Sequence, residues 1–312
     1  MQENSRTYRV GSAIITKIEE LTIDAFSASQ LFVQADQAVA DEQAKNWGAG
    51  SIDPSTGNLR LGFHSWLLQT PTQTVLIDTG VGADKERPNL EIFGHLHETF
   101  LARLREVGVT PDDVDLVLHT HLHVDHVGWN THNVGGQWVP TFPKATHVFS
   151  SREYDYVKSI SEKSGRDTAM RNALQLGRMQ VLPIVDFYAD SLLPVILHGQ
   201  GRMIEINGRQ TLDGFAFHST PGHSIDHASI SFISEGEEAF FWGDVMHSPI
   251  QFAVPTWNSV FCEFPDAATR SRAWAVAHAS ASHVTVFTTH FAESSVGKVR
   301  TTPSGYTWEF MS

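Results

Sequence analysis

The stretch HTHLHVDH at residues 119–126 constrains this chain more than any other feature. Four side chains that can bind a divalent cation fall within six residues: His121, His123, Asp125 and His126. The stretch follows an apolar run at 114–118 that predicts a buried strand. Ligands on a loop after a strand point to one side, whereas a surface helix would spread histidines at these spacings around its circumference. Imidazole with carboxylate suits zinc, iron, manganese or cobalt, so the stretch indicates a metal site.

Four more His or Asp residues stand where a strand-like run gives way to a loop: Asp78, His223, Asp244 and His290. Ligand and catalytic sites of α/β proteins are built at such strand ends. Each residue alone could be a turn or capping residue. Two metal ions that each keep an open position need about seven protein donors and a shared anion. Together with the four candidates of the HTHLHVDH stretch, these residues give eight candidates for that number.

The combined pattern resembles the metallo-β-lactamase superfamily, in which an HxHxDH motif precedes a lone His, a lone Asp and a final His. The resemblance covers residues 8 to 312 and implies an α/β (α+β) fold, a four-layer αββα sandwich of two mixed β-sheets with outer helices. It implies two metal ions held by seven residues: His121, His123 and His223 for the first, Asp125, His126 and His290 for the second, and Asp244 as the bridge. Asp78 would orient a ligand imidazole or the loop.

The spacings resemble the branch of this superfamily that holds N-acyl homoserine lactonases and methyl parathion hydrolase. Class B β-lactamases usually lack a histidine directly after the motif Asp, and this chain has His126 there. Glyoxalase II members carry a C-terminal helical domain, whereas residues 298–310 have the pattern of a hairpin. The 97-residue interval from His126 to His223 leans toward methyl parathion hydrolase. Compact lactonases place a Tyr three residues after the bridging Asp, where it helps to polarise the lactone carbonyl. Here that position is His247, which could donate the same hydrogen bond or line the pocket.

No linker, repeat or low-complexity tract divides the 312 residues, so we expect a single domain over 1–312. Helices are predicted at 36–47, 97–107 and 265–281, and strands at 9–23, 59–69, 74–78 and 298–310. The extra chain at about 150–200 includes a helical stretch at 167–179 and apolar segments at 181–188 and 192–197. We expect a helical cap that forms a pocket wall there; a packing or dimer element is the alternative.

Composition limits the partners and the compartment. The net charge of −13 and the lack of a dense Lys/Arg run argue against nucleic acid and favour neutral substrates. A single cysteine, Cys262, excludes an internal disulfide and fits the cytoplasm, and we expect it to be an inert core thiol. No signal peptide or membrane span is visible. A homodimer is one open alternative for the oligomeric state.

Two metal ions imply a mechanism in which a bridging water ionises near neutral pH and one cation polarises the substrate oxygen. Asp125 or Asp244 would carry the proton to the leaving group. Aromatic and apolar residues near the motif loops or in the insertion are candidates for the pocket: Phe63, Trp66, Trp129, Phe187, Tyr188, Met246 and Phe252. Several of these would also serve as ordinary core. His227 has no evident partner, so we expect it to be a surface or core residue.

The sequence therefore predicts a dinuclear metal-dependent hydrolase, with zinc as the first choice of metal. Its substrates would be lactones or esters that are neutral and hydrophobic, as in a quorum-quenching lactonase. A phosphotriesterase of the methyl parathion hydrolase type is the alternative enzyme. A non-catalytic metal-binding protein is the alternative from another class, although a scaffold has no need of an open bridging position.

Overall fold

A computed structural model of the protein describes residues 6–312 except 33, 88–90, 95, 97–98, 163 and 166–186. Two compact units make up the chain. Unit 1 comprises Met1–Glu20 and His64–Glu205, and unit 2 comprises Leu21–Phe63 and Ile206–Ser312. Two long strands, β2 and β3, each begin in one unit and end in the other.

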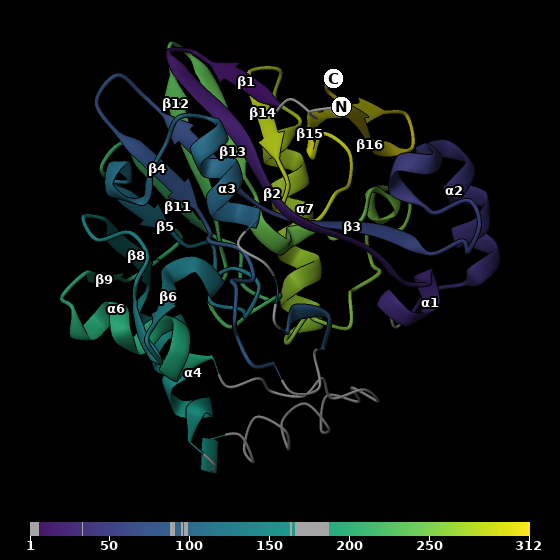
Figure 1. Ribbon diagram of the computed structural model, residues 1–312. Coiled ribbons are helices and arrows are strands. Elements are labelled where there is room, and N and C mark those ends of the chain that lie inside the picture. Colours follow the sequence, from purple (N-terminus) through teal and green to yellow (C-terminus); the bar gives the residue numbers. More distant parts are fainter. Residues whose placement is uncertain are drawn as a thin grey trace. The chain divides into compact units, whose positions relative to one another are not determined.

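Within the described residues the strands form two seven-stranded sheets and one two-stranded ribbon (Figure 1). The first sheet has the order β1 (Thr7–Val10), β2 (Ala13–Phe26), β3 (Leu59–Gln69), β4 (Thr74–Ile77), β5 (Leu116–Leu118), β8 (Thr146–Ser150) and β9 (Gly201–Ile204). The second has the order β10 (Arg209–Leu212), β11 (Phe215–Ser219), β12 (Ala228–Ser234), β13 (Glu237–Phe241), β14 (Val284–Phe287), β15 (Val296–Thr302) and β16 (Gly305–Phe310). The ribbon pairs β6 (Thr131–Val134) with β7 (Gln137–Pro140).

The described α-helices are α1 (Ala28–Leu31), α2 (Gln37–Ser51), α3 (Thr99–Glu106), α4 (Ser151–Ser161), α6 (Leu193–Leu197) and α7 (Pro265–Ala279). Shorter helical turns are η1 (Glu91–Phe93), η2 (Pro111–Asp113), η3 (Gly128–Asn130), η4 (Tyr188–Leu192), η5 (Gly243–Val245) and η6 (Pro249–Phe252). Local sequence fixes where helices begin. The Asp36 carboxylate accepts hydrogen bonds from the first backbone N–H groups of α2. Pro265 opens α7, and Asp266 in its first turn complements the helix dipole.

In unit 1 the strands β4, β5, β8 and β9 run parallel, so their carboxyl ends meet at one sheet edge. Helix α3 covers β4 and β5, which is why the residues of these two strands are apolar. Phe100, Leu101 and Leu104 of α3 pack with Leu76 of β4 and Val117 of β5 in one buried cluster. This edge positions the residues that follow β4 and β5, which are Asp78 and the HTHLHVDH loop.

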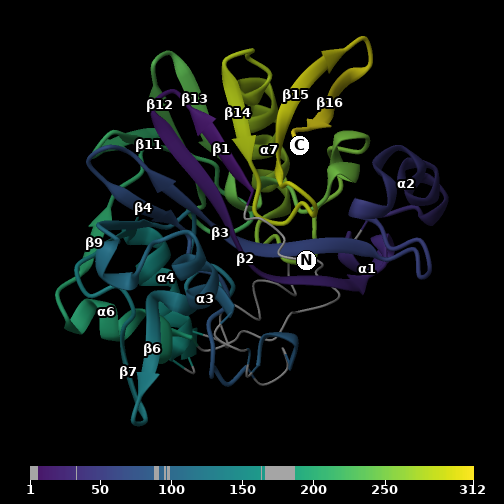
Figure 2. The same cartoon turned by 45° about the horizontal axis from the view of Figure 1, so that its top comes forward.

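In unit 2 the strand directions bring three loops to a single edge. Strands β13 and β14 run parallel, while β12 is antiparallel to both β11 and β13. The carboxyl ends of β11, β13 and β14 therefore point the same way. Helix α7 packs beside β14 and β15 (Figure 2), where its Ala275, Val276 and Ala279 join a buried cluster with Trp242 and Val286.

The structure confirms the mixed α/β class and the two large mixed sheets, which are those of the sandwich implied by the resemblance. The predicted helices at 36–47 and 265–281 are α2 and α7, and the helix predicted at 97–107 is α3, with 97–98 outside the described residues. The predicted pair at 59–69 and 74–78 and the hairpin at 298–310 are also present. Among the described residues no helix is both long and apolar enough to cross a membrane.

Of the predicted insertion at about 150–200, the structure describes α4, η4 and α6. The helix predicted at 167–179 lies outside the described residues, as do 181–186 of the first apolar segment. The Tyr154 and Tyr188 hydroxyls are 2.9 Å apart, so η4 packs on α4. The cap and the single domain stay predictions.

Candidate metal centre

The HTHLHVDH loop of unit 1 begins directly at the end of β5 and is held by its neighbours in the sheet. The His119 N–H donates to the Val148 carbonyl of β8 at 2.9 Å, and the Thr79 N–H donates to the His126 carbonyl at 2.8 Å. One end of the loop is thus hydrogen-bonded to β8 and the other to the segment that follows β4. His121 and His126 are buried, and His123 and Asp125 are partly exposed.

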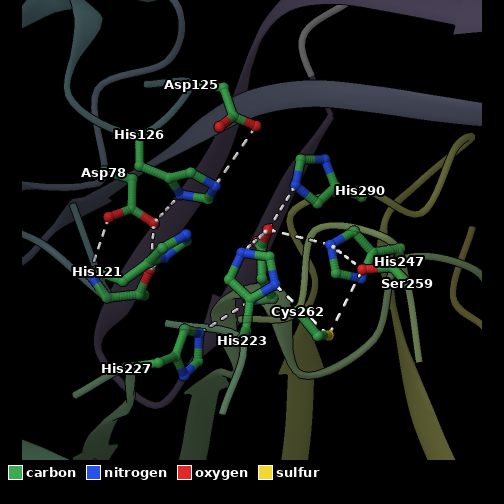
Figure 3. A network of polar contacts seen from close by, with 12 residues as sticks. Asp78, His121, Asp125, His126, His223, His227, His247, Ser259, Cys262 and His290 are labelled. Carbon is green, nitrogen blue, oxygen red and sulfur yellow. Dashed lines mark hydrogen bonds and ion pairs between the residues drawn. The ribbon is translucent and has the colours of Figure 1, made fainter. Parts of the chain in front are cut away.

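Asp78 organises this loop from the end of β4. Its carboxylate accepts hydrogen bonds from the Thr120 N–H at 2.9 Å and the Thr120 hydroxyl at 2.7 Å, and it lies 2.9 Å from His126 Nδ1 (Figure 3). Burial raises the pKa of Asp78, but the imidazoles of His126 and His119 outweigh it and hold that pKa at about 2. Asp78 adopts a left-handed backbone conformation (φ 58°), which Asp tolerates better than most residues. Asp78 thus contacts both His126 and the backbone of the loop; its role of orienting a metal ligand or the loop stays a prediction.

The imidazoles of the loop are oriented through one ring nitrogen. His126 Nδ1 faces Asp78, and its Nε2 lies 3.7 Å from Asp125 Oδ2 (Figure 3). His121 Nδ1 lies 3.0 Å from the Thr120 hydroxyl. In both rings Nδ1 contacts a protein oxygen, so Nε2 is the nitrogen that is left to bind a metal ion.

A buried carboxylate that sequence reasoning missed supports the same loops. Glu20 accepts hydrogen bonds from the backbone N–H groups of Val81 at 2.6 Å and Gly82 at 3.0 Å, and from the Trp129 indole at 2.7 Å. Burial raises the pKa of Glu20 to about 7, although these three donors favour its anion. Glu20 thereby joins the segment after Asp78 to the segment after the HTHLHVDH loop. Its place inside a strand gave no sign of this role.

The donors of unit 2 gather around one oxygen atom of Asp244. Its Oδ2 lies 2.9 Å from His290 Nε2, 3.2 Å from His223 Nε2 and 3.4 Å from His247 Nε2. All four side chains are buried. The strand directions explain this meeting, because His223, Asp244 and His290 follow β11, β13 and β14 at the same sheet edge.

Close packing of loops on α7 and β3 holds these donors in place. His290 Nδ1 donates to the Gly62 carbonyl of β3 at 2.9 Å, which turns Nε2 toward Asp244. Gly222 precedes His223 with φ 133°, and a Cβ there would lie 2.0 Å from the Ala268 nitrogen of α7. Only glycine allows the loop to approach the helix this closely. Cys262 Sγ lies 3.9 Å from His223 Nδ1, and burial raises the pKa of its thiol.

His227 is the second residue whose role the sequence did not reveal. Its Nε2 accepts a hydrogen bond from the Asp244 backbone N–H at 3.0 Å, so the proton of the ring sits on Nδ1, which faces the Thr220 carbonyl at 3.1 Å. The ring is fully buried, as the core alternative allowed. His227 therefore fixes the backbone of Asp244 and acts on the site without offering a further donor to it.

His247 lies beside the donors, three residues after Asp244. Its ring stacks on that of His290 with centroids 5.2 Å apart. The backbone N–H of His247 donates to the Gln251 side-chain oxygen at 2.7 Å. Its Nε2 is 3.4 Å from the Ser259 hydroxyl (Figure 3). Burial lowers the pKa of His247, which favours the neutral imidazole.

The aromatic residues predicted to line the pocket are mostly buried. Trp129 belongs to the cluster under α3, where it stacks on Phe100, and Met246 and Phe252 belong to the cluster under α7. Phe63 contacts the His290 ring edge-on at 4.9 Å, so it lies beside a candidate donor. The other three candidates are in unit 1. Trp66 packs against His64, Phe187 precedes η4, and Tyr188 is the first residue of η4. Their contact with a substrate stays a prediction.

Comparisons with known proteins agree with this arrangement. The model of the family described as the metallo-beta-lactamase superfamily matches residues 62–290. The chain belongs to the metallo-beta-lactamase superfamily. This membership confirms the predicted class of metal-dependent hydrolase. The N-acyl homoserine lactonase AttM of Azorhizobium caulinodans is 37% identical over 59 residues, which are 19% of this chain and 19% of that protein.

Two solved structures show the same fold over nearly the whole chain. Hydrolase AbOPH, of the beta lactamase superfamily, superimposes with a TM-score of 0.80 at 23% identity, over 99% of this chain and 98% of that chain. AidC, a dizinc quorum-quenching lactonase in complex with a product, superimposes with a TM-score of 0.77 at 19% identity, over 99% and 98%. At these identities the likeness shows the fold.

Proposed function

We propose that the protein is a dinuclear metal-dependent hydrolase that opens lactones or cleaves esters of neutral, hydrophobic substrates. The seven donors would be His121, His123, Asp125, His126, His223, Asp244 and His290. One observation carries the proposal: Asp244 Oδ2 lies between His223 Nε2 and His290 Nε2, at 3.2 and 2.9 Å. The family resemblance assigns these two imidazoles to different metal ions, so a single carboxylate oxygen between them suits a bridging ligand.

The chemistry of the donors fits metal ions. His126 and His290 each place Nδ1 against an oxygen, of Asp78 and of the Gly62 carbonyl, at 2.9 Å. Such contacts fix the tautomer and aim Nε2, as they do for most metal-binding histidines. The donor set of imidazoles and carboxylates suits zinc first, with iron, manganese and cobalt as alternatives. AidC, with the same fold, is described as a dizinc enzyme, which supports two ions.

When bound, two such ions supply an ionised bridging water as nucleophile and polarise the oxygen of the scissile group. The side chains of this protein then have defined tasks. Asp125 or Asp244 would carry a proton toward the leaving group; they lie beside the imidazoles of His126 and His290 respectively. His227 holds the backbone of Asp244, and Asp78 orients the ring of His126, which lies beside Asp125. His247 would donate a hydrogen bond to the substrate carbonyl, since its ring is buried beside Asp244.

The choice of substrate rests on charge and on the relatives. The net charge of −13 disfavours anionic substrates. AttM is named as an N-acyl homoserine lactonase, and AidC as a quorum-quenching lactonase. A neutral lactone with an acyl chain is therefore the first choice. The phosphotriesterase alternative is favoured by the 97-residue interval between His126 and His223, which resembles the methyl parathion hydrolase side of the family.

The test is kcat/KM on one metal-replete preparation, for a medium-chain acyl homoserine lactone beside an aryl phosphotriester. The proposal expects a lactone value of about 10⁴ M⁻¹s⁻¹ or above, the lower end of common enzyme efficiency, and a far smaller phosphotriester value. The same preparation treated with chelator is the control. The reverse ratio would assign a phosphotriesterase. Negligible turnover of lactones, esters and phosphotriesters alike, with metal bound, would favour the non-catalytic alternative.

A further inference from the structure

A second cluster of histidines with a glutamate lies in unit 2 and shares no residue with the donors around Asp244. The register of the sheet brings it together. His218 of β11 pairs with Ser229 of β12, and Ser231, two residues on, lies on the same face. Ser231 pairs with Phe240 of β13, and Glu238, two residues before Phe240, again lies on that face. His218, Ser231 and Glu238 therefore project from one side of three adjacent strands.

Helix α7 covers this side of the sheet and adds to the cluster. Trp274 and His278 are four residues apart, so they lie on the same side of the helix. The His278 ring packs on Phe240, with centroids 4.8 Å apart, and its Nε2 lies 2.7 Å from Glu238 Oε1. The Glu238 N–H donates to the carbonyl of His283 at 3.0 Å, and His283 Nε2 lies 3.7 Å from Glu238 Oε2.

We propose that His218, Glu238 and His278 bind one divalent metal ion, with zinc preferred, and that His283 supplies the fourth ligand. One nitrogen or oxygen atom from each of the first three lies within 4.8 Å of the others. Zinc bonds to imidazole and carboxylate of about 2.0–2.2 Å put the ligand atoms of a tetrahedral site roughly 3.4 Å apart. Binding would therefore open the 2.7 Å contact of His278 Nε2 with Glu238 Oε1 and draw the more distant atoms together. Two imidazoles with one carboxylate form a known zinc set, and a third imidazole completes a tetrahedral site.

Burial and charge at the cluster suit a cation. The Glu238 carboxylate is almost fully buried. Among the described residues its ion-pair partners are His278 and His283, and no Lys or Arg pairs with it. His278 stands in the last turn of α7, where the helix dipole favours positive charge. Burial lowers the pKa of His218 to about 4. Burial raises the pKa of Glu238, but the hydrogen bonds from His278 and Ser231 and the charges of the His278 and His218 imidazoles together outweigh it and lower that pKa. A neutral imidazole and a carboxylate need lose no proton to bind a metal ion.

The ion would join the end of α7 to two strands of the sheet, β11 and β13. His278 is 28% exposed at its side chain and His283 is 54% exposed, so the cluster is open to solvent on the helix side. Trp274, 41% exposed, stacks on His278 with centroids 5.2 Å apart. An indole this close to a bound Cu²⁺ ion is quenched, which makes Trp274 a reporter for this cluster alone.

The test compares zinc bound per full-length chain after dialysis against buffered micromolar zinc. His278→Ala and Glu238→Gln should each bind one ion fewer than the wild type. His198→Ala removes an exposed histidine of unit 1 and should bind as many ions as the wild type. The difference of one ion holds whatever number the donors around Asp244 bind. Equal zinc content in all four proteins would overturn the proposal.

Two further readouts separate this site from the hydrolase site. Zinc should raise the Tm of the wild type more than that of His278→Ala, and kcat/KM of the metal-replete His278→Ala variant should equal that of the wild type. Cu²⁺ should quench a component of the fluorescence that is missing in Trp274→Phe. A quench of equal size in the wild type, Trp274→Phe and His278→Ala would contradict binding at this cluster.

Discussion

Replacing Asp78 by asparagine tests how the protein positions its metal ligands. The Asp78 carboxylate has three close contacts, with the Thr120 N–H, the Thr120 hydroxyl and His126 Nδ1. Asparagine keeps one accepting oxygen and puts an NH₂ group in place of the other, so it loses at least one of these bonds. If the NH₂ faces His126, Nδ1 becomes the acceptor and the proton moves to Nε2, which can then no longer bind a metal ion.

The expected loss of metal affinity and of stability follows from these contacts. Loss of such a supporting group weakens metal affinity or activity by about 10- to 100-fold. We expect the Kd of the weaker of the two ions to rise by this factor, and kcat/KM to fall at limiting metal and to recover at saturating metal. Removal of a charged acceptor from buried donors should also lower the free energy of unfolding by about 1–3 kcal/mol.

Asparagine is the informative replacement because Asp78 has φ 58°, a conformation that Asn also tolerates and Ala does not. The matched control is Asp115→Asn, which alters a carboxylate in the same unit that accepts the Thr74 N–H at 2.8 Å on the surface. Isothermal titration with zinc, run on both variants, measures the effect. Metal affinity and kcat/KM of Asp78→Asn equal to those of Asp115→Asn would refute the reasoning.

Three other substitutions follow from the site. Asp244→Asn should lower kcat by orders of magnitude with an unchanged circular dichroism spectrum, because it removes the charge shared by the imidazoles; near-normal turnover would contradict the bridge. His247→Phe should lower kcat on lactone with metal content unchanged, and an unaltered kcat would leave His247 as pocket lining. Glu20 has its pKa raised from 4.5 to about 7, so the folded state keeps a proton that the unfolded state has lost, and stability falls as pH rises between those values. Relative to Glu20→Gln, the wild type should lose roughly 3 kcal/mol of unfolding free energy between pH 4.5 and 8, measured by urea denaturation; parallel pH profiles would count against it.

The strand ends were predictable because apolar runs followed by His or Asp carry a strong local signal. Asp78, His223, Asp244 and His290 each stand just after a strand, as expected. Their convergence within each unit follows from strand direction, which a single sequence does not encode locally. The parallel pairing of β13 with β14 is the feature that brings His290 to Asp244.

Residues that act through buried hydrogen bonds were not predictable. Glu20 lies in an alternating strand and His227 in a polar loop, and each meets its partners only after the chain has folded. The cluster of His218, Glu238 and His278 spans two strands and a helix, so no spacing in the sequence marks it. Which aromatic side chains line a pocket was harder still to predict, since the same residue types build the core. Trp129, for example, lies in the buried cluster under α3.

The most direct test of a dinuclear metal-dependent hydrolase is reconstitution of the chelated protein with zinc while lactone hydrolysis and bound metal are measured together. The His278→Ala variant is the protein to use, because it lacks a donor of the second cluster. Activity should be absent without metal and should rise to a plateau at two ions per chain. Full turnover of the metal-free chain, or a plateau at one ion, would contradict the account.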